Sequence, residues 1–168
     1  MFNIVLLEPE KPENTGNIGR TCVITDTNLH LIYPIGFSLT RKNIHKAGLD
    51  YWDRLNLIKH DNFDEFLSFV DEKSKNNNIW YATTKGKLCY TDVNYKDGDY
   101  IVFGKESAGI PEEILSKNVG NCIRIPMISE ERSLNLSNSV AIVLYEALRQ
   151  NNFKNMEKMG NLHRLQYI

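Results

Sequence analysis

Short apolar runs rich in β-branched residues alternate with segments of helical spacing, and this alternation restricts the fold more than any other feature of the chain. The predicted strands are residues 4–7, 29–35, 55–58, 79–83, 100–104 and 122–127. The predicted helices are residues 18–25, 41–47, 63–72, 111–117 and 136–150. Strands that are apolar along nearly their whole length favour an α/β fold, with a mostly parallel sheet and helices on both faces.

No internal repeat or linker divides the 168 residues. The two turn-rich connections, residues 75–78 and 94–99, have the composition of surface turns. A chain of this length buries a core without needing disulfides or metal. We therefore expect one domain over residues 1–168, of which about 151–168 form a C-terminal tail.

Composition excludes several classes of protein. The three cysteines are widely separated without a CxxC pair, and the four histidines lack metal-ligand spacing, so neither a metal site nor a disulfide framework is expected. The first residues do not resemble a signal peptide, and no apolar stretch is long enough to cross a bilayer. We expect a cytoplasmic protein with no membrane partner. A net charge of −1 excludes nucleic-acid binding by global positive charge but permits a local basic patch.

Three polar, glycine-bearing loops follow predicted strands, at residues 12–20, 104–111 and 125–137. Ligands bind to parallel sheets at the carboxyl ends of the strands, so these loops indicate a single site. Residues 104–111 are not a Walker phosphate loop, because Ile110-Pro111 replaces the required Gly-Lys-Ser/Thr, and the chain has no GxGxxG motif. A tight strand-to-helix turn without any ligand explains this loop equally well.

Residues 14–19 precede or open the first predicted helix, whose free N–H groups favour an anion such as phosphate. Arg20 projects roughly opposite Ile18 and shares its side of the helix with Val23 and Ile24. It can therefore stand beside a second buried surface. A solvated helical arginine is the simpler interpretation of this spacing.

The last predicted helix is apolar on more than one face. One apolar stripe consists of Leu136, Val140, Val143, Leu144, Ala147 and Leu148. Ile142 and Tyr145 add apolar bulk outside this stripe. A second apolar face favours contact with another copy of the chain in a symmetric dimer. Burial of the whole helix in the core of its own chain is the alternative.

Basic residues are spread along the chain, and residues 41–46 form the densest local group. Tyr51 and Trp52 follow closely and offer stacking surfaces for RNA bases. A solvated helix face with buried aromatic side chains explains the same residues.

Read together, the loop segments resemble the SPOUT methyltransferases of the SpoU branch. The likeness is greatest to the small single-domain enzymes that methylate the ribose of the wobble nucleotide in tRNA. The matching segments are Asn14-Thr-Gly-Asn-Ile-Gly-Arg20, Val102-Phe-Gly-Lys-Glu-Ser-Ala-Gly-Ile-Pro111, Ile125-Pro-Met127 and Ser133-Leu-Asn-Leu-Ser-Asn-Ser-Val140. Further matches at Glu8-Pro9, His30-Leu-Ile32, Ala47-Gly-Leu-Asp-Tyr51 and Thr83-Thr-Lys-Gly86 extend the likeness over nearly the whole chain.

The resemblance implies a SPOUT fold with a deep C-terminal trefoil knot, a topology that pattern rules alone reject. It also implies a homodimer with sites near the subunit interface, tRNA as partner, and S-adenosylmethionine as methyl donor, held largely by backbone groups. The implied function is 2′-O-methylation of the wobble ribose, on cytidine or modified uridine, with S-adenosylhomocysteine as product. Ribose methylation at another tRNA position or in rRNA, and a non-catalytic RNA-binding protein of the same fold, are the alternatives.

The functional positions of the family fall on particular residues of this chain. The implied catalytic residues are Asn14, Arg20 and Asn135. The implied donor contacts are Ala82, Thr83, Gly104, Glu106, Gly109, Ile125, Met127, Ser133 and Leu134. The implied RNA contacts are Arg20, Arg41, Lys46 and Tyr145, with residues 154–164 as further candidates.

In the implied reaction, the ribose 2′-oxygen attacks the methyl carbon in line with the bond that breaks, and positioning supplies much of the acceleration. A guanidinium stays protonated in proteins, so an arginine is a poor acceptor for the hydroxyl proton. Our hypothesis is that Arg20 stabilises the developing 2′-oxyanion and clamps a neighbouring phosphate. A phosphate oxygen or water then accepts the proton.

Overall fold

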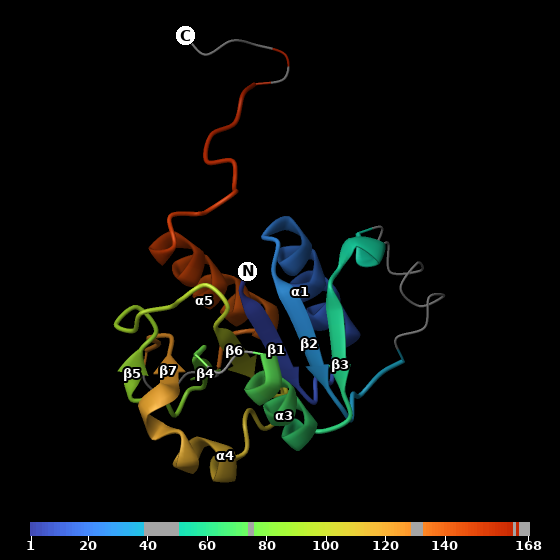
Figure 1. The fold of residues 1–168 in the computed structure, drawn as a ribbon, viewed down its shortest axis with the longest axis vertical. Helices are drawn as coiled ribbons and strands as arrows, with labels where there is room; N and C mark the ends of the chain where they lie inside the picture. The colour runs from blue at the N-terminus through green and yellow to red at the C-terminus, as the bar shows by residue number, and fades with distance from the viewer. Residues whose placement is uncertain (39–50, 74–75, 129–132, 163, 165–168) are drawn as a thin grey trace.

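The centre of the molecule is a sheet in which all neighbouring strands run parallel. The computed structural model describes residues 1–38, 51–73, 76–128, 133–162 and 164. Within this part the sheet has seven strands, in the order β3-β2-β1-β6-β4-β7-β5 (Figure 1). The strands are β1 Asn3–Leu7, β2 Asn28–Ile32, β3 Leu57–His60, β4 Ile79–Ala82, β5 Leu88–Cys89, β6 Tyr100–Phe103 and β7 Cys122–Arg124.

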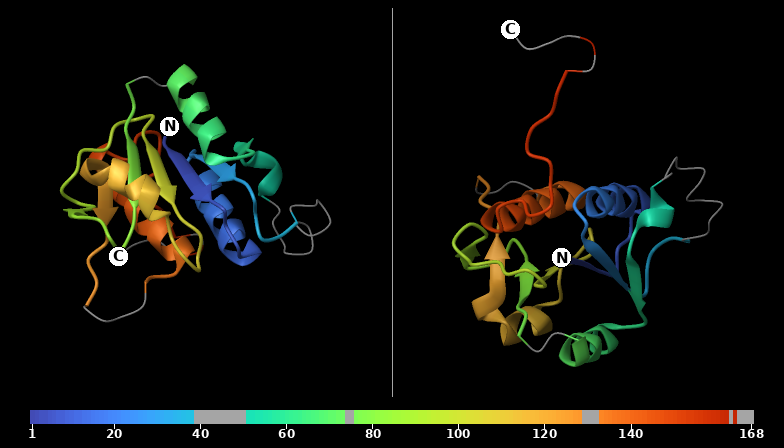
Figure 2. Two further views of the ribbon diagram at one scale, coloured as in Figure 1. Left: turned by 90° about the horizontal axis from the view of Figure 1, so that it is seen from below. Right: turned by 45° about the horizontal axis from the view of Figure 1, so that its top comes forward.

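Helices cover both faces of this sheet (Figure 2). On one face, α1 (Pro12–Ile24) lies beside α5 (Leu136–Gln150). On the other face lie α3 (Phe63–Lys73) and α4 (Glu112–Lys117). The predicted α/β fold with a mostly parallel, doubly covered sheet is confirmed.

Strand β1 shows why both faces need a cover. All five of its residues are buried, and successive side chains of a strand point to opposite faces. Ile4 and Leu6 pack with residues of α1 and α5. Val5 and Leu7 pack instead with residues of α3 and α4. A strand buried on both faces has no polar side, which explains the continuous apolar runs of the sequence.

Two boundaries near the loops differ from the predictions. Helix α1 begins at Pro12 rather than at residue 18, because proline suits the first helical turn. Residues 14–19 therefore lie inside the helix instead of preceding it. Strand β7 ends at Arg124 rather than at residue 127, because Pro126 has no N–H for the ladder.

Two strands were also misjudged or missed. Strand β3 begins at Leu57 rather than at residue 55, because the 3-10 helix η1 (Trp52–Arg54) ends on Leu55. Strand β5 has two residues, Leu88–Cys89, which is too short to produce a recognisable pattern. The helix predicted at residues 41–47 lies outside the described residues.

Helix α5 buries one face and exposes the other. Val140, Val143, Leu144 and Ala147 are fully buried, as the predicted stripe requires. By contrast, Ile142 and Tyr145 are 37% and 41% exposed. The interpretation that α5 is buried all round in its own chain is therefore wrong. None of the described helices is both long and apolar enough to cross a membrane.

Beneath α3, His30 of β2 and His60 of β3 form a buried pair. His30 Nδ1 lies 2.9 Å from His60 Nε2, and His30 Nε2 lies 3.4 Å from Asn3 Oδ1. Because Asn3 donates through Nδ2 to Gly98 O and accepts from Asn28 at Oδ1, its amide orientation is fixed. His30 therefore carries its proton on Nε2 and accepts a hydrogen bond from His60 at Nδ1.

This pair makes stability depend on pH. Burial, with a smaller contribution from His60, lowers the pKa of His30 to about 3. Burial also lowers the pKa of His60, although Glu65 opposes the shift. In the unfolded chain both histidines take up protons near pH 6.5, whereas in the folded chain their lowered pKa values keep them neutral to lower pH. We therefore expect the free energy of unfolding to hold above pH 6.5 and to fall below it, by up to about 1.4 kcal/mol per pH unit for each histidine.

Thermal melting between pH 7.5 and 4.5 measures this dependence. The double variant His30→Asn, His60→Asn loses both titrating groups, so its melting temperature should fall less steeply on acidification. Equal slopes for the wild-type protein and the double variant would contradict the assignment.

Candidate active site

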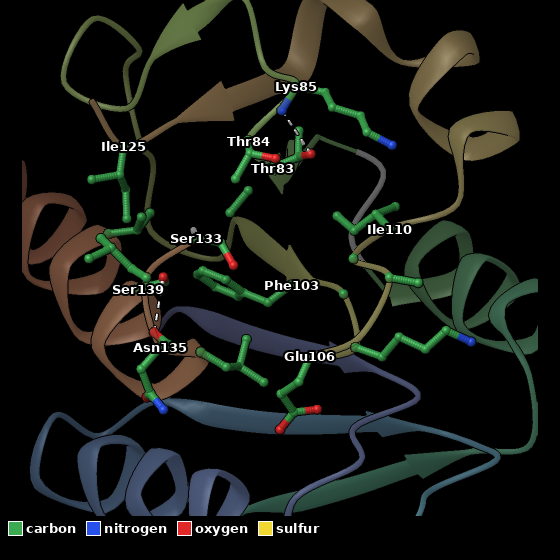
Figure 3. Close-up of a pocket in the computed structure, with 18 of the residues that line it drawn as sticks. Thr83, Thr84, Lys85, Phe103, Glu106, Ile110, Ile125, Ser133, Asn135 and Ser139 are labelled. Atoms are coloured by element: carbon green, nitrogen blue, oxygen red, sulfur yellow. Dashed lines mark hydrogen bonds between the residues drawn. The ribbon is translucent and has the colours of Figure 1, made fainter. Parts of the chain in front are cut away.

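A cavity of about 450 Å³ lies at the carboxyl ends of β4, β6 and β7 (Figure 3). Its walls come from the residues after β4, the glycine-bearing loop after β6, and the segment that leads from β7 into α5. Asn14 of α1 and Asn135 also line it. All nine predicted donor contacts line the same cavity: Ala82, Thr83, Gly104, Glu106, Gly109, Ile125, Met127, Ser133 and Leu134.

The loop between β6 and α4 folds back on itself. Gly109 N donates to Lys105 O at 2.8 Å, and Gly109 has φ 71°, in the left-handed region that favours glycine. A Cβ on Gly104 would lie 2.1 Å from the carbonyl carbon of Gly109, so only glycine fits there. The two interpretations of this loop are thus compatible, because it is a tight turn and its backbone also lines the cavity.

Glu106 joins this loop to the start of α1. Its Oε1 accepts from Asn14 Nδ2 at 2.8 Å, and its carboxylate also accepts from the backbone N–H groups of Glu10, at 2.8 Å, and Lys11, at 3.3 Å. These donors lie at the positive end of α1, which begins at Pro12 and stabilises a negative charge. The sequence suggested a phosphate at this helix start. The anion found there is the carboxylate of Glu106.

Asn135 joins the start of α5 to the same group. Its Nδ2 donates to Asn14 Oδ1 at 3.0 Å. Its Oδ1 accepts from the N–H groups of Ser137, at 2.9 Å, and Asn138, at 3.4 Å, which makes Asn135 the N-cap of α5. We call Glu106, Asn14 and Asn135 the loop-joining network. Asn14 uses both ends of its amide on these two neighbours, so the network fixes its orientation.

Two charged contacts hold the glycine-bearing loop against the residues that follow β1. Glu10 accepts from Ser107 N at 2.8 Å and from Ser107 Oγ at 2.7 Å, and these bonds hold the pKa of Glu10 below its usual value. Lys105 Nζ lies 2.8 Å from Glu8 Oε2, and its hydrogen bond to Glu8 raises the pKa of Lys105. Charge-assisted hydrogen bonds therefore reinforce the loop-joining network.

The residues after β4 form the opposite wall. Thr83 N donates to Ile123 O at 2.9 Å, and Lys85 N donates to Thr83 Oγ1 at 3.2 Å. A Cβ on Gly86 would lie 2.6 Å from the carbonyl carbon of Ile123. Lys85 Nζ lies 2.6 Å from Glu112 Oε1 of α4, and this hydrogen bond lowers the pKa of Glu112. This wall is thus held mainly by backbone contacts and again needs a glycine.

The third predicted catalytic residue, Arg20, stands apart from the cavity. Asn14 and Arg20 are six residues apart on α1, so their side chains point about 120° apart around the helix. Arg20 is exposed, and its guanidinium carbon lies 5.3 Å from the centre of the Tyr51 ring. Tyr145, exposed on α5, also lies outside the cavity lining. Arg41 and Lys46, two of the predicted RNA contacts, lie outside the described residues.

Several cavity residues were not predicted from the sequence to belong to the site. They include Lys11, Lys85, Tyr90, Phe103, Lys105, Ser107 and Val143. Lys85 lies inside a segment that matches the resembled family, which was a usable signal. Tyr90 follows the two-residue strand β5, so no strand pattern drew attention to it.

The chemistry offered by this lining is binding and orientation. Its side chains are amides, hydroxyls, lysines, the carboxylate of Glu106 and apolar groups, and no described histidine or cysteine is among them. Burial raises the pKa of the Cys22 thiol, which does not line the cavity, to about 12, so that thiol is unreactive. Within the described ranges, no group of three or more His, Cys, Asp or Glu residues is placed to hold a metal ion.

The chain is similar in sequence and fold to known proteins. The model of the SpoU rRNA methylase family matches residues 1–145. A protein of Listeria monocytogenes, provisionally named tRNA (cytidine(34)-2′-O)-methyltransferase, is 52% identical over 90% of this chain and 89% of its own length. The tRNA (cytidine(34)-2′-O)-methyltransferase of Saccharophagus degradans is 46% identical over 91% of this chain and 97% of its own. A solved structure described as giving insights into the 2-OH methylation of C/U34 on tRNA is 38% identical, with a TM-score of 0.82 over 90% of this chain and 97% of its own.

The loop-joining network predicts a stability effect. Glu106→Ala leaves the N–H groups of Glu10 and Lys11 and the amide of Asn14 without their acceptor, so we expect the free energy of unfolding to fall by about 1–3 kcal/mol. Denaturant unfolding monitored by circular dichroism measures it. The matched control Glu72→Ala removes an exposed carboxylate from α3 and should change stability by less than about 0.5 kcal/mol. Equal effects of the two substitutions would refute a structural role for Glu106.

Proposed function

The chain belongs to the SpoU rRNA methylase family, and on this premise we propose that it methylates the 2′-oxygen of the ribose of nucleotide 34 in tRNA. Nucleotide 34 is the wobble position of the anticodon, and the proposed substrates carry cytidine or a modified uridine there. One observation carries the proposal: all nine predicted donor contacts line one cavity, in a chain similar over nine-tenths of its length to proteins named for this reaction.

The cavity is proposed to hold S-adenosylmethionine, and its residues fit that molecule. A cavity of about 450 Å³ is in the size range of small-molecule sites. Gly104 leaves no room for a Cβ and Gly109 lines the cavity with bare backbone, so backbone groups are available to a ligand. Phe103, Ile125 and Leu134 supply apolar surface. When bound, the donor supplies a methyl group carried on a positively charged sulfur. The proposal requires no metal ion.

The residues of the chain then position the acceptor. The 2′-oxygen attacks the methyl carbon as the carbon–sulfur bond breaks, and the hydroxyl proton passes to a phosphate oxygen or to water. Asn14 and Asn135 line the cavity with amides of fixed orientation, which suits them to hold the ribose. Arg20 stabilises the negative charge that develops on the 2′-oxygen and clamps a neighbouring phosphate.

The position of Arg20 bears on the proposed assembly. Since Arg20 does not line the cavity of its own chain, we infer that it serves the cavity of a second copy in a homodimer. The exposed Ile142 and Tyr145 of α5 offer an apolar face for this contact. Such a dimer forms its sites near the subunit interface, and its surface binds tRNA through Tyr145, Arg41, Lys46 and the basic residues between 154 and 164.

The proposal also includes a C-terminal trefoil knot within a single domain. Strand β7 passes beyond β4 and pairs on its far side, and the chain then crosses back to place α5 beside α1. That path supports the knot. The proposed location is the cytoplasm, where tRNA is modified, and the three cysteines are free thiols, as in a reducing compartment.

Nucleoside mass spectrometry tests the reaction. Total tRNA from a strain that lacks this gene is incubated with the purified protein and S-adenosylmethionine. We expect new 2′-O-methylcytidine or a 2′-O-methylated uridine derivative, mapped to nucleotide 34. Arg20→Lys keeps a charge but loses the planar fork and should lower the rate at least tenfold, about 1.4 kcal/mol. New ribose methylation only at another tRNA position, or binding of S-adenosylmethionine without any new methylation of tRNA, would refute the proposal.

Mixed dimers test where Arg20 acts. Arg20→Ala removes the guanidinium, and Ser133→Trp fills the cavity from an exposed position that tolerates bulk. Each variant alone should retain about one hundredth of the wild-type activity or less, which remains measurable. If Arg20 serves the partner's cavity, a mixture allowed to exchange subunits regains about a quarter of the wild-type activity, because half of the dimers are mixed and each has one complete site. No recovery in exchanged dimers would place Arg20 at its own cavity.

A further inference from the structure

The guanidinium of Arg20 lies over the ring of Tyr51, and we propose that Tyr51 is the positioning residue that orients Arg20 for methyl transfer. The inference rests on the proposed function and adds a residue to it. Tyr51 lies next to η1 (Trp52–Arg54), which sits beside α1 (Figure 2). Tyr51 is not among the residues that line the cavity or form the loop-joining network.

Tyr51 is tied to the helical turn that carries Arg20. Its side chain is 4% exposed, and its Oη donates to Gly16 O at 2.5 Å. In an α-helix the carbonyl of residue 16 also accepts from the N–H of residue 20. The hydroxyl therefore anchors the ring one turn before Arg20, and the ring follows any movement of that turn.

The close approach of η1 to α1 depends on Gly19. A Cβ at residue 19 would lie 3.1 Å from Cζ3 of Trp52 and 3.3 Å from Cδ2 of Leu55. These distances are shorter than ordinary van der Waals contacts. A larger residue at position 19 would push η1, and Tyr51 with it, away from α1. Glycine thus allows the ring to reach Arg20.

A ring contact suits an arginine that must act on an anion. The guanidinium carbon of Arg20 lies 5.3 Å from the centre of the Tyr51 ring, within the range of cation–π interactions. The aromatic carbons of the ring are not conventional hydrogen-bond acceptors, so this contact leaves the guanidinium N–H groups available for an anion. Among the described residues no carboxylate forms an ion pair with Arg20. A carboxylate would neutralise the charge, whereas the ring orients Arg20 and leaves its charge intact.

A double-mutant cycle tests this role in the methyl-transfer assay. Tyr51→Phe keeps the ring, so kcat should stay within about threefold of wild type. Tyr51→Leu removes the ring, and we expect kcat to fall about tenfold with an unchanged KM for S-adenosylmethionine. When Arg20→Ala is already present, Tyr51→Leu should have almost no further effect, since no guanidinium remains to be oriented. Phe69→Leu, which removes a partly buried ring from α3, is the matched control and should leave kcat unchanged.

A series of ring-fluorinated phenylalanines at position 51 tests the same point without loss of packing. Each fluorine weakens the negative face of the ring and barely changes its size. We expect log kcat to decrease stepwise with fluorine number, while the melting temperature stays constant. A flat series, or an equal loss from Tyr51→Leu with and without Arg20, overturns the inference while the proposed function stands. A wild-type protein that transfers no methyl group to tRNA overturns both.

Discussion

The carboxylate of Glu106 holds together the glycine-bearing loop after β6 and the starts of α1 and α5, which meet at the cavity. It connects the loop after β6 to Asn14, 92 residues earlier in the sequence, and Asn14 connects onward to Asn135, 121 residues later. Hydrogen bonds to an ionised carboxylate are stronger than those between neutral groups, and this one also faces the positive end of α1. Without it, α1 and α5 would lose their hydrogen-bonded link through Asn14 to the glycine-bearing loop.

The parallel sheet determines where this network can form. Because β4, β6 and β7 run in the same direction, the loops that follow them meet at one edge. The backbone supplies much of the wall there, and Gly104 and Gly86 occur where a Cβ would overlap neighbouring carbonyl carbons. A wall of this kind binds a ligand through backbone N–H and C=O groups, which do not depend on the type of side chain. The chemically distinctive side chain, Arg20, stands on another side of α1 and is aimed by an aromatic ring.

Sequence patterns predicted the parts of this architecture that depend on local composition. The buried strands and the stripe of α5 were predictable because their apolar spacing reflects burial directly. The start of α1 was missed because Gly16 and Gly19 suggest a loop. In the structure Gly19 lies inside the helix, where the absence of a Cβ lets the Trp52 ring pack closely against it. The nine donor contacts came from family resemblance, since backbone-lined sites leave no side-chain pattern. The separation of Arg20 from Asn14 was not predictable, because it depends on how far around α1 the cavity extends.

The proposed reaction transfers the methyl group of S-adenosylmethionine to one atom of tRNA, the 2′-oxygen of nucleotide 34. The most direct measurement is transfer of a radiolabelled methyl group from S-adenosylmethionine to two otherwise identical tRNAs, one with ribose and one with 2′-deoxyribose at nucleotide 34. A third tRNA with 2′-deoxyribose at nucleotide 32 controls for any general effect of a missing hydroxyl. We expect full labelling of the ribose and control tRNAs and none of the 34-deoxy tRNA. Equal labelling of all three would contradict it.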